Sequence, residues 1–392
     1  MRMRCLLGQH LKKKEFNVVH TSIKLNILRK IERDTDNLVS LFFYGKLEIL
    51  GGTMAKYWKW GFVMIAAVWA ALIGTMLGYG WNKTHPPGVV PDSIQSENTN
   101  LSIETQEKME GYWTVALFGV DSREGHLGKG TRSDMEMVCN INLGTGEIRL
   151  VSIYRDTFVK INEKNRYDKI NEAYFQGGPK QAIYALNENM DLTVDDYASF
   201  SWRSVVDAIN LLGGIDVEIT PEEFKVINGF ITETVESTAV GSHHLKESGL
   251  NHLDGVQAVA YARLRKMDTD FQRTKRQRKV VELVLQKAKN ADIMTLTKVV
   301  QAVIPQISTS IGIKDLLPLI KQMKQFHLTE AKGFPFDLKD VMIGKRDCVI
   351  PVTLEKNVIE LHKFLFDEES YEPSDHVKEI SNQIIQRSKK GK

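Results

Sequence analysis

An uncharged run is the strongest constraint on what this chain can fold into. From Trp60 to Trp81 the sequence reads WGFVMIAAVWAALIGTMLGYGW, 22 residues without Asp, Glu, Lys or Arg. A helix rising about 1.5 Å per residue would cross the roughly 30 Å hydrocarbon layer of a bilayer with this length. A signal-peptide core is shorter, about 7–15 residues, and ends at a small-residue cleavage site. The run therefore predicts one retained transmembrane helix over residues 60–81.

Basic residues flank this run unequally. Lys56 and Lys59 directly precede it, whereas Lys83 alone directly follows it. Because the flank richer in Lys and Arg stays in the cytoplasm, we expect residues 1–59 to be cytoplasmic and everything after Lys83 to lie outside the cell membrane. Met54, which begins MAKYWKWGF, is an alternative start of the chain.

The composition indicates a folded globule. Of the 392 residues 42% are hydrophobic and 26% are charged, and the formal net charge is +3. Such a chain can bury one large core or two modest ones, and it lacks the composition of a disordered protein. Its three cysteines, at positions 5, 139 and 348, are too few for a disulfide framework. We expect Cys139 to be a buried thiol, with a Cys139–Cys348 bridge as the alternative.

The residues after the uncharged run divide into a spacer and three strands. Residues 82–110 are rich in Pro, Ser, Asn and Glu without a period, which predicts a stalk. Apolar and β-branched residues then predict strands over 113–120, 135–143 and 147–154. The short turn GTG makes the last two an antiparallel hairpin.

Charged residues stand at corresponding ends of these strands. If the first two strands pair antiparallel, the end of the first, the start of the second and the end of the third meet at one edge of the sheet. Polar groups beyond strand ends commonly form sites in α/β proteins. The residues expected to converge there are Asp121, Arg132, Asp134, Arg155 and Asp156.

Helical patterns dominate the rest of the chain, and no second linker interrupts them. The predicted helices span 169–178, 179–190, 202–214, 253–263, 295–307 and 313–326. IDVEI at 215–219 and DCVIPVT at 347–353 are predicted strands, and residues 220–242 are predicted to be an irregular excursion. We therefore expect a catalytic domain over 111–290, completed by helices and a strand from 291–392.

The clearest helix begins inside a strongly basic stretch, residues 261–279. Arg273, Arg276 and Gln277 recur at steps of three and four and continue into the apolar stripe of Val280, Val281, Val284 and Leu285. Arg273 and Gln277 should thus point to the rim of the core, with Arg276 unassigned. Lys275, Arg278 and Lys279 are predicted to face outward.

Two interpretations of the basic stretch remain open. The plainer one is a solvated surface on which Asp268 and Asp270 form weak ion pairs. The other is an anion site, because arginine binds phosphate bidentately, and two carboxylates such as Asp121 and Asp134 can hold Mg²⁺ together with phosphate oxygens. Arginines with a carboxylate-bound metal would suit a diphosphate.

An ordered set of motifs carries a family resemblance over roughly residues 112–290. The motifs are LFGVDSREG, GTRSDMEMV, LVSIYRDTFVKI, DKINEAYFQGG, LLGGIDVEI and HLDGVQAVAYARLRKMDTDFQRTKRQRKV. In this order they resemble the LytR-CpsA-Psr family of membrane-anchored cell-envelope proteins. The resemblance implies a single α/β/α ectodomain with a central mixed sheet, outside the cytoplasmic membrane of a Gram-positive bacterium.

The activity that the resemblance implies is a phosphotransfer. Such proteins move an anionic glycopolymer, of the wall teichoic acid or capsule type, from an undecaprenyl-diphosphate carrier to peptidoglycan. If the family's residue roles are carried to the matching positions of this sequence, Asp121 and Asp134 would be the ligands of Mg²⁺. The diphosphate would be bound by Arg132, Arg155, Arg263, Arg265, Arg273 and Gln277. Arg155 would act in catalysis, with Asp121 or Asp156 as the base. The sequence departs from the usual motifs at Tyr154, where proline is common, and at Met135.

Two other functions compete with transfer. A polyprenyl-diphosphate binding protein or pyrophosphatase would keep the fold without ligation. A membrane-bound transcriptional regulator would need a DNA-binding element in the cytoplasmic segment, and residues 1–59 contain no helix-turn-helix pattern. We therefore expect no nucleic-acid partner.

Overall fold

The computed structural model of this protein describes residues 98–121, 126–265, 270–312 and 324–390. The predicted cytoplasmic segment and the uncharged run at 60–81 lie outside these residues, as do residues 313–323 of the helix predicted over 313–326. Among the helices that are described, none combines the length and the apolar character needed to cross a bilayer.

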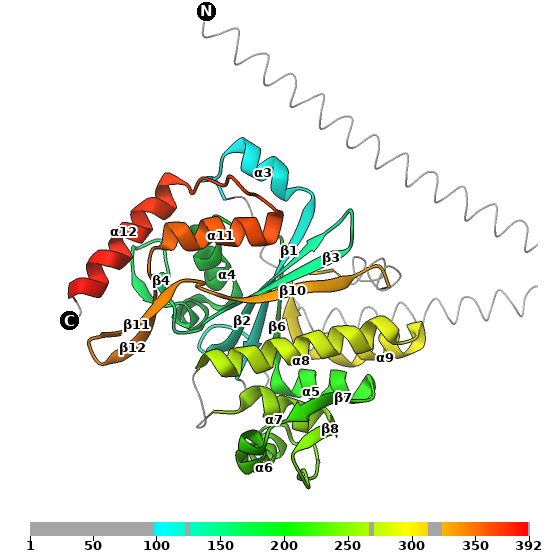
Figure 1. Ribbon diagram of the computed structural model, residues 1–392. Helices are drawn as coiled ribbons and strands as arrows, with labels where there is room; N and C mark the ends of the chain where they lie inside the picture. Colours follow the sequence, from blue (N-terminus) through cyan, green and yellow to red (C-terminus); the bar gives the residue numbers. More distant parts are fainter. Residues whose placement is uncertain (1–97, 122–125, 266–269, 313–323, 391–392) are drawn as a thin grey trace, which may run out of the picture. The chain divides into compact units, whose positions relative to one another are not determined.

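A six-stranded sheet forms the centre of the domain, and it is mixed, as the family resemblance implied (Figure 1). Its strand order is β10-β3-β2-β1-β6-β9. The strands are β1 (Tyr112–Val120), β2 (Ser133–Asn142), β3 (Glu147–Ile153), β6 (Asp196–Ser201), β9 (Ile307–Thr309) and β10 (His327–Phe334). β2 runs antiparallel to both β1 and β3, whereas β1 is parallel to β6 and β3 is parallel to β10. The three strands predicted from the sequence and their antiparallel pairing are thus confirmed.

Helices cover both faces of this sheet (Figure 1). One face carries α3 (Ile103–Met109), α4 (Asn171–Met190), α11 (Leu354–Phe366) and α12 (Asp375–Lys390). The other carries α8 (Asp270–Asn290), and beyond it α7 (Gly255–Arg263) packs on α8, α5 (Trp202–Leu211) and α6 (Pro221–Thr238), while α9 (Ile293–Val303) packs on α5. The α/β/α arrangement expected from the family resemblance is therefore present.

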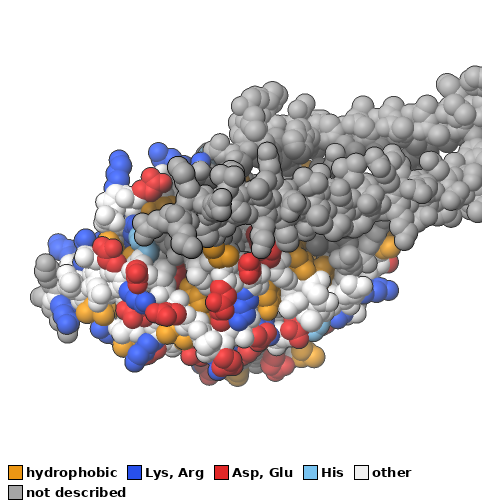
Figure 2. Space-filling view, turned by 90° about the horizontal axis from the view of Figure 1, so that it is seen from above, with side chains coloured by type: hydrophobic (Ala, Val, Ile, Leu, Met, Phe, Trp, Pro, Cys, Tyr) orange, Lys and Arg blue, Asp and Glu red, His pale blue; other side chains and the backbone are white. Residues whose placement is uncertain are grey.

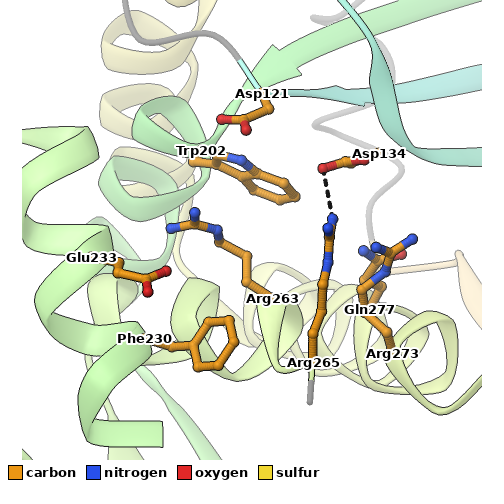
Figure 3. Close-up of a pocket in the computed structure, with 9 residues that line it drawn as sticks. All are labelled: Asp121, Asp134, Trp202, Phe230, Glu233, Arg263, Arg265, Arg273 and Gln277. Carbon is orange, nitrogen blue, oxygen red and sulfur yellow. Dashed lines mark hydrogen bonds and ion pairs between the residues drawn. The ribbon is translucent and has the colours of Figure 1, made fainter. Parts of the chain in front are cut away.

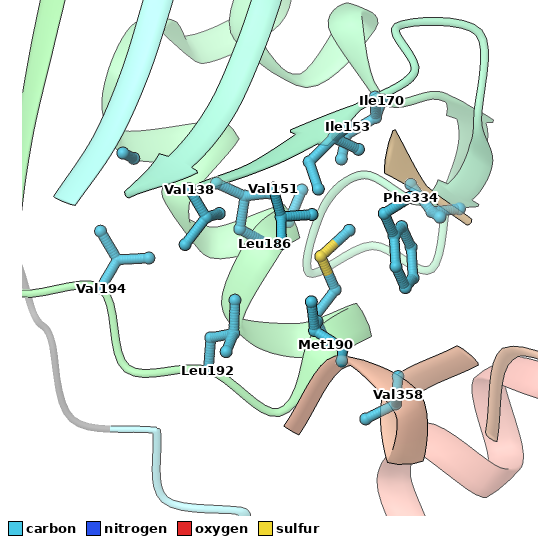
Figure 4. Close-up of a cluster of buried hydrophobic side chains, with 14 of the residues drawn as sticks. Val138, Val151, Ile153, Ile170, Leu186, Met190, Leu192, Val194, Phe334 and Val358 are labelled. Atoms are coloured by element: carbon cyan, nitrogen blue, oxygen red, sulfur yellow. The ribbon is translucent and has the colours of Figure 1, made fainter. Parts of the chain in front are cut away.

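The side chains of β2 alternate between two hydrophobic cores, one on each face of the sheet. Val138 belongs to the larger core, which joins the sheet to α4 and α11 (Figure 4). Met135 and Met137 point to the opposite face, where Val281 of α8 packs on them. Because side chains alternate with period 2, β2 is buried on both faces, and the face of Val138 also buries the polar side chains of Glu136 and Asn140.

The described end of the segment predicted as a stalk is folded into the domain. Residues 98–110 are part of the domain: Leu101 and Met109 enter the large core, and the amide of Asn98 donates to the carbonyls of Asn187 and Leu192. Ser102 caps α3 by accepting from the backbone of Thr105. A seven-residue helix with few apolar residues gives little periodicity, which is why the sequence did not indicate it.

The excursion predicted over residues 220–242 is wrong, because most of it is the helix α6. Thr220 and Glu223 form a reciprocal capping box, and Pro221 occupies the first turn. Buried residues recur along the helix at steps of three and four, at Ile227, Phe230, Ile231 and Thr234. The predicted pair of helices over 169–190 is confirmed as one element with a kink at Gly178, whose φ is 67°.

Three short hairpins complete the fold. They are β4 (Phe158–Lys160) with β5 (Tyr167–Lys169), β7 (Ile215–Ile219) with β8 (Gly249–Leu253), and β11 (Leu338–Ile343) with β12 (Arg346–Pro351). The strand predicted over 347–353 is β12, which pairs with β11 outside the central sheet. Cys139 and Cys348 are both free thiols, so the alternative disulfide is wrong.

Candidate functional site

Three strand ends position charged side chains at one edge of the sheet, as expected. β1 ends at Val120 directly before Asp121, and β2 begins at Ser133 directly before Asp134. β3 ends two residues before Arg155. The antiparallel register of β2 with both neighbours makes these three ends coincide.

The helices α7 and α8 contribute further arginines from the other side. Arg263 is the last residue of α7, and Arg265 follows after Leu264. In the first turns of α8, Arg273 and Gln277 are only 2% and 4% exposed, so both point inward as the helical period predicted. Lys275 and Lys279 are exposed, also as predicted.

These elements enclose a cavity of about 290 Å³ (Figure 3). Two aspartates, three arginines and one glutamine of the predicted site line it: Asp121, Asp134, Arg263, Arg265, Arg273 and Gln277. Residues that lie far apart in the sequence thus converge on one partly enclosed volume, as an anion site requires and a solvated basic face does not.

Asp134 lies at the centre of the charge network. Nη1 of Arg155 lies 2.7 Å from its Oδ1, and Nη2 of Arg265 lies 3.0 Å from its Oδ2. Burial would by itself raise the pKa of this carboxyl, but Arg155, Arg265 and Arg273 outweigh it and hold the pKa below its ordinary value. Asp134 is therefore ionised at neutral pH, and it connects Arg155 to the cavity.

Arg263 is held by neutral groups. Its Nη1 donates to Oγ1 of Thr234 at 2.9 Å, and its guanidinium lies 6.0 Å from the ring centroid of Trp202. No ion pair joins it to a carboxylate among the described residues. A guanidinium whose hydrogen bond goes to a neutral hydroxyl remains available to pair with an incoming anion.

Two predicted site residues point elsewhere. Arg132 pairs with Glu172, with its Nη2 2.8 Å from Oε1, and its guanidinium lies 4.8 Å from the ring of Phe175. Asp156 pairs with Nζ of Lys169 at 2.8 Å, and its Oδ2 also lies 3.7 Å from Nε of Arg155. Neither residue lines the cavity, and neither does Arg155, which is joined to it through its ion pair with the lining residue Asp134.

The remaining arginines of the basic stretch have structural contacts. Arg276 is buried, pairs with Glu223 of α6 at 3.4 Å and donates to the carbonyl of Leu264. Arg278 was expected to face outward, but it is half-buried and hydrogen-bonds Tyr154, just beyond the end of β3. Asp268 lies outside the described residues.

The cavity fits a magnesium ion that takes only two ligands from the protein, both of them carboxylates. Asp121 and Asp134 line the same cavity, and Asp134 is ionised. The described residues contain no group of three or more His, Cys, Asp and Glu side chains that could form a metal site on their own. Mg²⁺ is commonly held by one or two carboxylates together with substrate phosphate oxygens, which is the situation that this cavity offers.

Comparison with known proteins identifies the family. A model of the LytR_cpsA_psr family matches residues 90–357. The chain belongs to this family. A relative from Bacillus cereus strain AH820, named polyisoprenyl-teichoic acid–peptidoglycan teichoic acid transferase TagU, is 30% identical over 266 residues, which are 67% of this chain and 76% of that protein.

Solved structures show that the LytR_cpsA_psr fold is shared. A structure named TagT bound to LIIa-WTA aligns with a TM-score of 0.54 and 21% identity, covering 71% of this chain and 96% of that one. A structure named as a transcriptional regulator from Enterococcus faecalis aligns with a TM-score of 0.55 and 23% identity, with the same coverages. At these identities the likeness concerns the fold alone.

Three cavity residues of this family member were missed from the sequence: Trp202, Phe230 and Glu233. Trp202 follows β6, whose last residue, Ser201, pairs with Val120 of β1, so the indole stands beside Asp121. A strand assigned to DYASFS would have indicated this. Phe230 and Glu233 lie on α6, which the sequence did not reveal as a helix.

Proposed function

We propose that this protein transfers an anionic glycopolymer from an undecaprenyl-diphosphate carrier to peptidoglycan, forming a phosphodiester and releasing undecaprenyl phosphate. The observation that carries the proposal is the cavity in which Asp121 and Asp134 meet three arginines. Membership of the LytR_cpsA_psr family and the name of the Bacillus cereus relative support transfer of this class.

The arginines and the glutamine would bind the diphosphate. Arg263, Arg265 and Arg273 carry charge into a partly enclosed volume, and the amide of Gln277 adds neutral donors. Hydrogen bonds between charged groups are shorter and stronger than neutral ones, and arginine's planar fork matches two phosphate oxygens. Arg155 and Arg265 already bind Asp134, so phosphate oxygens placed beside that carboxylate would lie within their reach.

Asp121 and Asp134 would hold Mg²⁺ together with the diphosphate oxygens. When bound there, the ion would supply charge neutralisation on the diphosphate. Its role is a proposal that rests on the two carboxylates in one cavity.

The chemical step would be an in-line displacement at phosphorus. A muramic acid hydroxyl oxygen would attack the phosphorus that bears the glycopolymer, and the bond from that phosphorus to undecaprenyl phosphate would break. Asp121 is favoured over Asp156 as the group that accepts the hydroxyl proton, because Asp121 lines the cavity whereas Lys169 engages Asp156. Arg155 would stabilise the charge that develops on the phosphoryl oxygens.

Substrate and location are linked in this proposal. Undecaprenyl carriers and the growing wall meet at the outer face of the cytoplasmic membrane, where the segment at 60–81 would anchor the domain as a single-pass protein. On the face visible in Figure 2, acidic and basic side chains intermingle, and such a surface does not favour nucleic acid.

The proposal is tested by ligation with the full-length protein. Arg155→Ala should lower the rate of transfer from an undecaprenyl-diphosphate-linked glycopolymer to peptidoglycan by about 10²–10³, the usual effect of losing one stabiliser of developing charge. Lys275→Ala, which removes an exposed charge on α8, should leave the rate unchanged. Transfer by Arg155→Ala at the wild-type rate would refute the role of Arg155. Release of free phosphorylated polymer without ligation would favour a pyrophosphatase.

A further inference from the structure

A β-bulge interrupts β2 beside the cavity. Gly119 of β1 pairs with Met135. The next rung of the ladder joins Val120 to Ser133, so Asp134 is left without a cross-strand partner. Bulges are over-represented next to active sites, where the extra residue re-aims a side chain. The bulged residue here is the carboxylate at the centre of the charge network.

The bulge decides which face of the sheet Asp134 takes. In an unbroken ladder Asp134 would lie opposite Val120, and directly opposed residues share a face. Val120 is fully buried in the large core, so a regular ladder would direct the carboxylate into that core. The extra residue instead puts Ser133 opposite Val120 and leaves Asp134 on the cavity side. There the carboxylate pairs with Arg265 (Figure 3).

A hydrogen bond spans the bulge on the large-core face. The hydroxyl of Ser133 donates to Oε1 of Glu136, three residues later in the strand. Residues three apart lie on opposite faces of a regular strand, so this contact exists because the bulge adds one residue between them. Ser133 is fully buried, Glu136 is 1% exposed, and Oε2 of Glu136 has no partner among the described residues. The two polar side chains thus partner each other inside an apolar core.

The buried pair favours the bulged register of the two strands. Burial of a polar group is unfavourable unless it is hydrogen-bonded, and fixing a register is the best-attested use of buried polar groups. In the unbroken ladder Ser133 would move to the opposite face and lose Glu136. Gly119 also suits the bulge, since a Cβ there would lie 3.0 Å from the Cβ of Met135, tighter than most such contacts.

We propose that Ser133 and Glu136 are positioning residues that lock the bulge and thereby fix the carboxylate of Asp134. That carboxylate binds two arginines at once, with Nη1 of Arg155 2.7 Å from Oδ1 and Nη2 of Arg265 3.0 Å from Oδ2. N–H···O hydrogen bonds span about 2.7–3.2 Å, so a small displacement of the carboxylate would release an arginine. The inference rests on the proposed function for the ligand of these arginines, and it adds two residues that line no cavity wall themselves.

Binding of undecaprenyl diphosphate to the full-length protein in detergent tests the lock. Ser133→Ala removes one hydroxyl and Glu136→Leu removes its acceptor, and each should weaken binding by about tenfold, the effect of losing one hydrogen bond to a charged group. Because both changes remove the same bond, the double variant should bind no more weakly than either single one. Glu136→Gln keeps the acceptor for Ser133 and should bind like the wild type.

Two further variants separate positioning from a general loss of stability. Asn140→Leu changes a buried polar residue near the other end of β2, whose side-chain amide donates to the carbonyl of Leu365. It should lower the urea midpoint of unfolding and leave the affinity for undecaprenyl diphosphate unchanged. In an Asp134→Asn background, Ser133→Ala should have little further effect on binding, because a positioning residue acts through the group that it positions.

Equal or tighter binding by Ser133→Ala would overturn the inference, as would a loss in Asn140→Leu or Glu136→Gln of the same size. An undiminished effect of Ser133→Ala in the Asp134→Asn background would also overturn it. A protein that binds the diphosphate, loses this affinity in Ser133→Ala and never ligates would refute the proposed function and leave the positioning role standing. Ligation by a protein whose binding is unaffected by Ser133→Ala would do the reverse.

Discussion

Replacing Glu136 by Gln should change how the stability of this protein depends on pH. Glu136 lies inside β2, 1% exposed, and its Oε1 accepts from the hydroxyl of Ser133 while Oε2 has no partner among the described residues. Burial raises the pKa of its carboxyl from 4.5 to about 7. Burial disfavours the charged form, so the folded protein keeps this carboxyl protonated at a pH where the unfolded chain has released the proton.

The sign and size of the pH effect on stability follow from this difference in protonation between the folded and unfolded states. Between pH 4.5 and pH 7 the folded state binds one more proton than the unfolded state, so the free energy of unfolding falls as pH rises. A shift of that width corresponds to about 3 kcal/mol at about 1.4 kcal/mol per pKa unit. The contribution is fully present below the unfolded pKa and is lost once the pH exceeds the folded pKa.

Gln keeps the acceptor for Ser133 and does not ionise in this range. As the pH is raised from 4 to 8, we expect the free energy of unfolding of Glu136→Gln to increase by about 3 kcal/mol relative to that of the wild type. Urea unfolding of both full-length proteins at several pH values measures this difference, in which the contributions of all other groups cancel. Parallel curves for the two proteins would refute the buried, neutral state of Glu136.

Two further substitutions test the packing and the site. Gly255→Ala should destabilise the protein by about 1–3 kcal/mol, because a Cβ there would collide with the carbonyl of Val206 in α5. Gly229→Ala in α6, where a Cβ meets nothing, is the control, and equal unfolding midpoints would contradict the clash. Glu172→Gln should tighten binding of undecaprenyl diphosphate about two- to fivefold by releasing Arg132, a modest effect because exposed ion pairs contribute about 0–1 kcal/mol. Unchanged or weaker binding would mean that Arg132 does not reach the diphosphate.

Local patterns predicted the part of the site that depends on them. β-branched runs and the short turn after β2 place the ends of β1, β2 and β3 together, and with them Asp121 and Asp134. The 3.6-residue period predicted that Arg273 and Gln277 point inward, because the same stripe continues into the buried Val280. Both inferences needed only the geometry of single elements and one hairpin.

What the sequence did not reveal depends on tertiary contacts. The strand β10 carries polar residues such as Glu330 and Lys332, and only its pairing with β3 makes it a strand. Arg278 was assigned to the outer face by its helical position, but the hydroxyl of Tyr154 draws it inward. Arg132 does not line the cavity because its guanidinium pairs with Glu172, which lies 40 residues later in the chain.

Electron density for undecaprenyl diphosphate in the protein purified from membranes would test the central claim most directly. The proposal predicts the diphosphate in the cavity, with phosphate oxygens within hydrogen-bond distance of Arg263 and Arg273. The polyprenyl chain should then enter between the sheet and α8, displacing Val281 from Met135 and Met137. A head group bound away from these arginines, or a cavity that stays empty at saturating lipid, would contradict the account.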